Sequence, residues 1–300
     1  MNLLPDLVEL VALRGAAQGL NLRAHRPSLA RLQGGHRSAQ RGRGLEFEEV
    51  RLYAPGDDAR NIDWRVTARR GRVHTKLFRE ERERPVWLVA DLHAGLFFGS
   101  RRQLKSALLL RAAALLGWVA ALGGDRLGAV IATGDGKPHI YAPRSRQAGV
   151  LPVLEALVEL QPRRPAAATT SLVAALTDLR PLLQPGSLVL ILSDFAGVDA
   201  QVETQLAAMT THCDLRLLWL VDALECNGLP AGAYRVGLPD RLWWLDGERS
   251  RTQWLRTWRE RERGISELAQ RLNLPLTRLD TGHDVAQALP MLLREPSWAA

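Results

Sequence analysis

The sequence lacks the motifs of several large enzyme classes. It has no GxxxxGK[ST] phosphate-binding loop, no GxGxxG turn between a strand and a helix, no HExxH pair and no GxSxG nucleophile elbow. Its seven histidines are scattered, and none has a neighbour at metal-ligand spacing. These absences argue against P-loop, dinucleotide-binding, zincin and α/β-hydrolase chemistry.

Cysteine and lysine are both scarce. The two cysteines, Cys213 and Cys226, form no CxxC motif, so we expect free thiols in a reducing cytoplasm rather than a disulfide framework. Lys76, Lys105 and Lys137 are the three lysines among 40 Lys and Arg residues, in a chain of net charge +8. Such an arginine excess follows genome composition as readily as function, which weakens a nucleic-acid interpretation.

Long apolar runs are also lacking. The most apolar segment, Ser106–Leu122, contains Arg111 and is marginal in length for a membrane span. We interpret it as a buried helix, and we find no signal-peptide pattern at the N-terminus. The expected location is therefore the cytoplasm, without a membrane span, although peripheral membrane association stays open.

From Val86 onward, short apolar runs alternate with helical patterns. This alternation predicts an α/β fold: a mainly parallel open sheet with helices on both faces. The predicted strands are 86–91, 126–132, 187–193, 214–221 and 274–279, with a further edge strand at Lys137–Tyr141. The predicted helices are 101–122, 146–160, 171–183, 199–210, 251–272 and 284–294.

The first part of the chain has a different pattern. We expect an N-terminal helix and basic arm over residues 1–44, a small β-containing region over 45–85, and the α/β domain over 86–295. The segment Arg14–Arg43 contains seven arginines and no acidic residue, which suits a solvated linker or an arm that binds nucleic acid or an anionic membrane surface. Within the second region, a slip in the apolar alternation at Glu48–Glu49 predicts a bulged strand, and further extended pieces are expected around Arg70–Arg72.

Two acidic residues follow predicted strands directly, Asp91 and Asp194. Both are expected at the carboxyl edge of the sheet, where open α/β sheets bind ligands. Thr169, Thr170 and Ser171 open a helix between them in sequence. Carboxylate and hydroxyl oxygens suit a hard cation such as Mg²⁺. The alternative is that these residues cap the helices that follow them.

These residues resemble those of a von Willebrand factor A domain, in which an Asp-x-Ser-x-Ser loop, a Thr and a second Asp hold a metal ion that a partner's acidic side chain completes. A longer resemblance begins at Arg41. The phrases RLYAPGDDARNIDW and TARRGRVHTKLFREE resemble the signature of the bacterial domain-of-unknown-function 58 family, and the resemblance continues through Lys105, Asp222 and Glu225. It implies a von Willebrand-like, non-catalytic interaction module. The resemblance further implies that the module acts with a MoxR-type AAA+ ATPase in assembling or activating a client protein.

The metal loop departs from that pattern. It reads Asp-Leu-His-Ala-Gly from Asp91, so His93 and Gly95 replace both serine ligands. The departure implies that a divalent cation, Mg²⁺ or Mn²⁺, binds weakly or not at all at Asp91, His93, Thr170 and Asp194. In a rival interpretation, His93 joins the two aspartates to hold Mn²⁺ or Zn²⁺. A metal-dependent hydrolase has least support, because no base or nucleophile accompanies the carboxylates.

Two further clusters have open interpretations. The first is the family signature, which contains acidic, basic and aromatic residues. In one interpretation it is an ion-paired turn that its aromatic side chains fasten to the sheet. In the other it is a docking or catalytic surface. The signature residues are Glu46, Arg51, Tyr53, Asp57, Asp58, Arg60, Asp63 and Trp64. Near the C-terminus, four tryptophans suit either core packing of a helix or a partner surface. They are Trp243, Trp244, Trp254 and Trp258.

Overall fold

The computed structural model describes residues 3–22, 45–54, 57, 59–80, 83–164, 172–238 and 241–294. The chain forms two compact units. The larger unit consists of Met1–Gln33 and Arg84–Ala300, and the smaller unit of Gly34–Glu83. The domain boundaries expected from the sequence, at residues 44 and 85, stay predictions.

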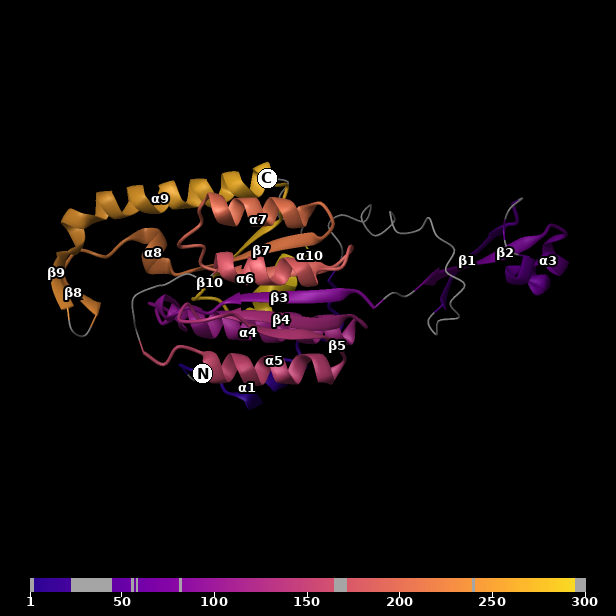
Figure 1. Ribbon diagram of the computed structural model, residues 1–300, viewed down its shortest axis with the longest axis horizontal. Helices are drawn as coiled ribbons and strands as arrows, with labels where there is room; N and C mark the ends of the chain where they lie inside the picture. The colour runs from indigo at the N-terminus through magenta and orange to yellow at the C-terminus, as the bar shows by residue number, and fades with distance from the viewer. Residues whose placement is uncertain are drawn as a thin grey trace. The chain divides into compact units, whose positions relative to one another are not determined.

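The larger unit is built on a six-stranded sheet (Figure 1). In spatial order its strands are β10 (Leu276–Asp280), β7 (Asp214–Val221), β6 (Leu188–Ser193), β3 (Pro85–Asp91), β4 (Arg126–Ala132) and β5 (His139–Ser145). The first five are parallel, and β5 pairs antiparallel with β4 at the edge. The mainly parallel α/β architecture predicted from the sequence is confirmed.

The central strands are apolar along their whole length because helices cover both faces of the sheet. Residues Val86–Asp91 of β3 and all of β6 are buried. One face packs on α1 (Leu7–Ala12), α4 (Lys105–Leu122), α5 (Gln147–Leu160) and α10 (Val285–Arg294). The other packs on α6 (Leu172–Leu179), α7 (Ala200–Thr210) and α9 (Gly247–Arg271). Figure 1 shows these two helical layers on opposite sides of the sheet. Continuous apolar runs of this kind are the signature of two-sided burial.

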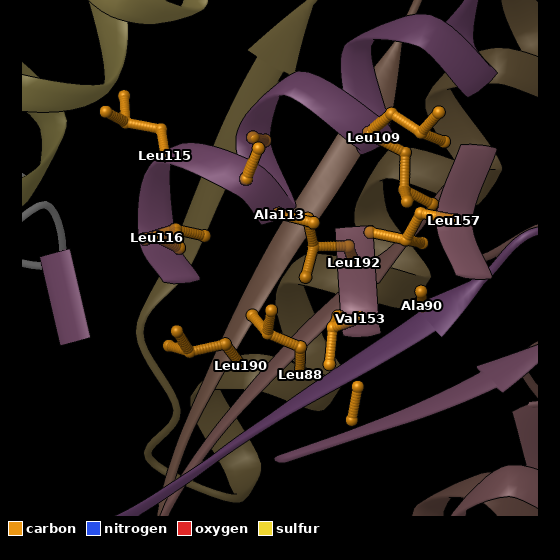
Figure 2. Packing of buried hydrophobic residues seen from close by; sticks show 14 of the residues in the cluster. Leu88, Ala90, Leu109, Ala113, Leu115, Leu116, Val153, Leu157, Leu190 and Leu192 are labelled. Atoms are coloured by element: carbon orange, nitrogen blue, oxygen red, sulfur yellow. The ribbon is translucent and has the colours of Figure 1, made fainter. Parts of the chain in front are cut away.

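Helix α4 forms the centre of the first layer. Figure 2 shows Leu109, Ala113 and Leu116 of this helix packed with Leu88 of β3 and Leu190 of β6. By length and composition α4 could cross a membrane, but 89% of it is buried inside the unit, as expected of a core helix. Its polar residues must therefore find partners within the protein.

A β-hairpin lies between β7 and α9 in sequence and was not predicted. After the short helix α8 (Ala223–Asn227), β8 (Ala233–Leu238) pairs with β9 (Arg241–Asp246), and α9 follows at once. Asp246 caps α9 by accepting hydrogen bonds from the backbone nitrogens of its first turn. In Figure 1 the hairpin lies at the end of α9 that extends past the sheet.

In its described residues, the smaller unit has one antiparallel ribbon and two short helices. Strand β1 (Leu45–Leu52) pairs with β2 (His74–Glu80), and the register shifts between Phe47 and Glu49, which confirms the predicted bulge. The connection contains a 3-10 helix (Ala59–Asn61) and α3 (Trp64–Arg70). The expectation of an extended segment leading into Arg70–Arg72 was wrong. Asp63 caps this segment as a helix, and Gly71 ends it with a left-handed φ of 68°.

Candidate functional site

The candidate site lies where the strand order reverses. From β3 the chain moves to β4 on one side, and from β6 it moves to β7 on the other, while β3 and β6 are neighbours. Asp91 ends β3 and Asp194 follows β6, so both reach the same carboxyl edge. Ligands bind at such switch points in open α/β sheets. Both aspartates therefore lie at the carboxyl edge of neighbouring strands, the edge at which the sequence predicts them.

Asp91 is buried and is held by the neighbouring strand. Its Oδ2 accepts a hydrogen bond of 2.6 Å from Ser193 Oγ. Ser193 Oγ in turn accepts 2.8 Å from the backbone nitrogen of Phe195, a residue with a φ of 51°. This chain of bonds fixes the turn after β6 and aims Asp194 into the edge.

Asp194 is a buried carboxylate surrounded by cationic groups. Its Oδ2 accepts 2.8 Å from the Lys105 ammonium, and its Oδ1 lies 3.4 Å from His93 Nε2 and 3.6 Å from Arg261 Nη2. Burial alone would raise the pKa of Asp194, but the hydrogen bond with His93 and the charges of Lys105, His93 and Arg261 lower it below the usual value. Asp194 is therefore held ionised.

Lys105 is the centre of this charge cluster. It opens α4, is almost wholly buried, and places Nζ 2.8 Å from both Asp194 Oδ2 and Glu225 Oε1. Burial alone would lower the pKa of Lys105, but the charges and hydrogen bonds of Asp194 and Glu225 outweigh it and raise that pKa. The ammonium also lies 5.9 Å from the centre of the Phe98 ring.

His93 completes the inner cluster. Its side chain is buried, and its Nε2 faces Asp194. Burial would lower the pKa of His93, but the hydrogen bond with Asp194 and the charges of Asp91 and Asp194 raise it above the usual value. Its Nε2 is directed at Asp194 Oδ1, so this ring nitrogen is already engaged by a carboxylate of the chain.

These residues do not fit a divalent metal ion of the kind that the resemblance implies. One carboxylate oxygen of Asp194 accepts a hydrogen bond from the Lys105 ammonium, and the other accepts one of 3.0 Å from the backbone nitrogen of Ala196. One carboxylate oxygen of Asp91 accepts a hydrogen bond from Ser193. Thr170 lies outside the described residues. In the part of the chain that the structure describes, no group of three or more His, Cys, Asp or Glu side chains is placed to hold a metal ion.

A further buried aspartate ties the loops of this edge together. Asp222 follows β7 and accepts 2.8 Å from the Ser100 backbone nitrogen and 2.5 Å from Thr281 Oγ1. It also caps α8 in a reciprocal box with Glu225, the residue that pairs with Lys105. The loops after β3, β7 and β10 are therefore joined through one carboxylate.

Sequence reasoning missed part of this cluster. Lys105 and Glu225 entered only through the family resemblance, and Arg261 not at all. One signal was present, since Lys105 is one of three lysines in the chain and stands at the start of its most apolar helix. A charge in such a place needs a buried partner.

The four tryptophans near the C-terminus divide between core and surface. Trp258 is buried and stacks on Trp219 with ring centres 5.3 Å apart, as core packing predicts. Trp254 donates 2.9 Å to the Glu225 carbonyl and, with Trp258, lines a groove of about 380 Å³. Trp243 and Trp244 are 50% and 74% exposed on β9, so core packing was wrong for them.

In the smaller unit, most signature residues shape the turn. Asp57 accepts 2.7 Å from Arg51 Nη2 and 2.9 Å from the Ala54 nitrogen, and Tyr53 donates 3.0 Å to the Asp57 carbonyl. The bonds with Ala54 and Arg51 lower the pKa of Asp57. Asp63 caps α3 through 3.0 and 3.1 Å bonds.

The remaining signature residues are placed differently. Trp64 is exposed on α3, so it does not fasten the turn as the structural interpretation required. Glu46 lies in β1, opposite Arg79 of β2 in the strand register. Arg60 lies in the 3-10 helix that precedes α3, and its side chain is exposed. Asp58 lies outside the described residues.

A family model described as "Protein of unknown function DUF58" matches residues 49–262. The chain belongs to the DUF58 family. Uncharacterized proteins of Mycobacterium bovis and Mycobacterium tuberculosis are 37% identical to it over 166 residues, which is 55% of this chain and 52% of each relative. The chain thus spans about half the length of the curated DUF58 relatives it matches.

Two solved structures are weakly similar to this DUF58 chain. The conserved hypothetical protein BatB from Bacteroides thetaiotaomicron matches at 10% identity and a TM-score of 0.43, covering 70% of this chain and 97% of its own. An uncharacterized membrane-spanning protein from Vibrio fischeri matches at 16% identity and a TM-score of 0.26, covering 68% and 93%. Neither similarity bears on the function of the site.

Proposed function

We propose that this chain is a non-catalytic protein-interaction module whose carboxyl edge contacts a partner without a metal ion. The partner we propose is a MoxR-type AAA+ ATPase, with which the module assembles or activates a client protein. A cytoplasmic location forms part of the proposal, and it accords with Cys213 and Cys226 being free thiols.

One observation supports the metal-independent part of this proposal. The Lys105 ammonium lies 2.8 Å from the carboxylates of Asp194 and Glu225, with His93 and Arg261 beside it. The Lys105 ammonium and the Arg261 guanidinium balance the carboxylates that would otherwise draw a divalent ion. The charge is supplied by side chains of the chain itself, so the edge keeps its shape without an added ion.

The fold type we propose is the von Willebrand factor A type. Its support is an open, mainly parallel sheet between two helical layers, with Asp91 and Asp194 meeting at the switch point. In the sequence, Thr170 also matches the position of the threonine metal ligand in von Willebrand factor A domains. Among the described residues, the serine beside the carboxylates, Ser193, is fully buried; it donates a hydrogen bond to Asp91 and accepts one from the Phe195 backbone nitrogen, so a substrate has no direct access to it.

The interaction is tested with the purified ATPase from the same genome on a biosensor. Arg101 is exposed on the loop after β3, at the carboxyl edge, and Arg180 is exposed before β6, at the opposite edge. We expect Arg101→Glu to weaken binding and the matched variant Arg180→Glu to leave it unchanged. Equal affinities for wild type and both variants would place the contact elsewhere and refute the proposal.

Metal independence is tested on the chain alone by thermal shift. We expect Mg²⁺, Mn²⁺ or Zn²⁺ to shift the melting temperature of the wild type no more than that of Asp194→Ala. Each shift is measured from the melting temperature of the same protein without added ion. Stabilisation of the wild type by Mn²⁺ or Zn²⁺ that disappears in Asp194→Ala would establish the rival site with His93. It would leave the biosensor result to decide the interaction separately.

A further inference from the structure

The smaller unit presents a basic surface that its own fold does not use. The surface is formed by the exposed side chains of α3 and of the turn that follows it. From Trp64 to Arg79 the sequence contains six Lys and Arg residues and no Asp or Glu. We name the part of it whose side chains are described the Trp64–Arg72 surface: Trp64, Arg65, Arg69, Arg70 and Arg72.

The arginines of this surface have no carboxylate partner among the described residues. Arg65, Arg69, Arg70 and Arg72 are exposed and take part in none of the ion pairs found there. Two neighbouring acids are already engaged, since Asp57 pairs with Arg51 and Asp63 caps α3. The positive field of the four guanidinium groups therefore points to solvent.

Part of the surface is hollowed. A depression of about 480 Å³ lies between the ribbon and the end of α3, lined by Arg51, Arg70, Arg72 and His74 with two apolar residues of β1. His74 is buried and pairs with the Arg72 carbonyl at 2.6 Å, and Arg51 is neutralised in part by Asp57. Arg70 and Arg72 remain to meet an incoming carboxylate, for which the planar guanidinium is well shaped.

Apolar side chains lie among these charges. Trp64 is 68% exposed, Leu52 51% and Val73 41%. Exposed tryptophan beside arginine is the composition of energetic centres in protein interfaces. A nucleic-acid backbone would be attracted by the charges alone, whereas Leu52 and Val73 gain only from an apolar partner.

We propose that the Trp64–Arg72 surface binds an acidic segment of a partner protein that also carries large apolar side chains. Its carboxylates meet Arg65, Arg69, Arg70 and Arg72, and one carboxylate enters the depression. Its apolar side chains pack on Trp64. This surface belongs to the smaller unit and the carboxyl edge to the larger one, and the two are tested by different variants, so the two proposals succeed or fail independently.

The test uses the full chain and a synthetic fluorescein-labelled peptide of alternating Glu and Asp with two Phe residues. Binding is followed by fluorescence anisotropy. We expect Arg65→Glu/Arg69→Glu to weaken binding about tenfold or more, since tenfold corresponds to about 1.4 kcal/mol and two charges are reversed. The matched control is Arg259→Glu/Arg263→Glu, at the same spacing on α9, where both arginines are exposed and outside the ion pairs of the described residues. This control should bind as the wild type does.

Trp64→Ala distinguishes a mixed surface from a purely electrostatic one. We expect this substitution to weaken binding of the Phe-containing peptide more than binding of a peptide in which both Phe residues are Ser. The proposal is overturned if both double variants bind equally well, or if an oligothymidylate of the same charge binds the wild type more tightly than the peptide. Circular dichroism melts check that each variant folds, and we expect them to be nearly unchanged because the substituted side chains are exposed.

Discussion

Replacing Lys105 with methionine should destabilise the larger unit severely. The methionine replaces the aliphatic part of the side chain and removes the ammonium that lies 2.8 Å from Asp194 and from Glu225. The Lys105 side chain is 3% exposed and that of Asp194 is 5% exposed, so little water can replace the lost charge. His93 and Arg261 remain near Asp194, but at 3.4 and 3.6 Å.

The magnitude follows from the burial of this pair. Removing one partner of a buried ion pair costs about 3–5 kcal/mol, because the other charge is left uncompensated. For a unit of this size, each kcal/mol lowers the melting temperature by about 2–4 °C, so we expect a fall of about 10 °C. Adding Asp194→Asn to Lys105→Met should restore part of the loss, which a double-mutant cycle measures as a coupling energy.

The assay is thermal and urea unfolding followed by circular dichroism. Lys137→Met is the matched control, because Lys137 is exposed and this identical chemical change should cost about 0.5 kcal/mol or less. If Lys105→Met lowered the free energy of unfolding no more than Lys137→Met does, the buried ammonium would not be balancing the carboxylates at the sheet edge. The reasoning behind the metal-independent site would then fail.

Three further results are expected. The raised pKa of His93 contributes stability that is present below about pH 6.5 and is lost as pH rises through the folded-state value, so His93→Gln should cost more in acid melts than in alkaline ones. Burial raises the pKa values of Cys213 and Cys226 to about 11, so a thiol reagent at neutral pH should label them only as the protein unfolds. Glu9→Gln should cost about 3 kcal/mol in urea unfolding, the low end for a buried pair, because Arg111 is buried while Glu9 is partly exposed.

The sequence predicts the framework of the larger unit well. Its strands and helices follow from apolar periods, and the edge strand at Lys137–Tyr141 was correctly placed near β5. The hairpin β8–β9 was missed because Trp243 and Trp244 are adjacent apolar residues on opposite sides of a ribbon, which breaks the alternation of a half-buried strand.

The candidate site was predictable only in part. Asp91, His93 and Asp194 could be placed together because parallel strands end at one edge. Lys105 lies 89 residues from Asp194 in sequence, and Arg261 lies 67 residues from it. They come together because α4 and α9, which carry them, pack on opposite faces of the sheet. No local period encodes such a meeting, so the cluster emerges only from the three-dimensional arrangement.

Helix α4 also joins two distant places in the larger unit. At its first residue Lys105 is bound to the sheet edge, and two turns later Arg111 Nε donates 2.6 Å to Glu9 of α1. Further along, Trp118 Nε1 donates 3.1 Å to the Leu10 carbonyl. The charge cluster at the sheet edge and the anchoring of α1 therefore depend on one continuous buried helix, which links the two places through its own side chains.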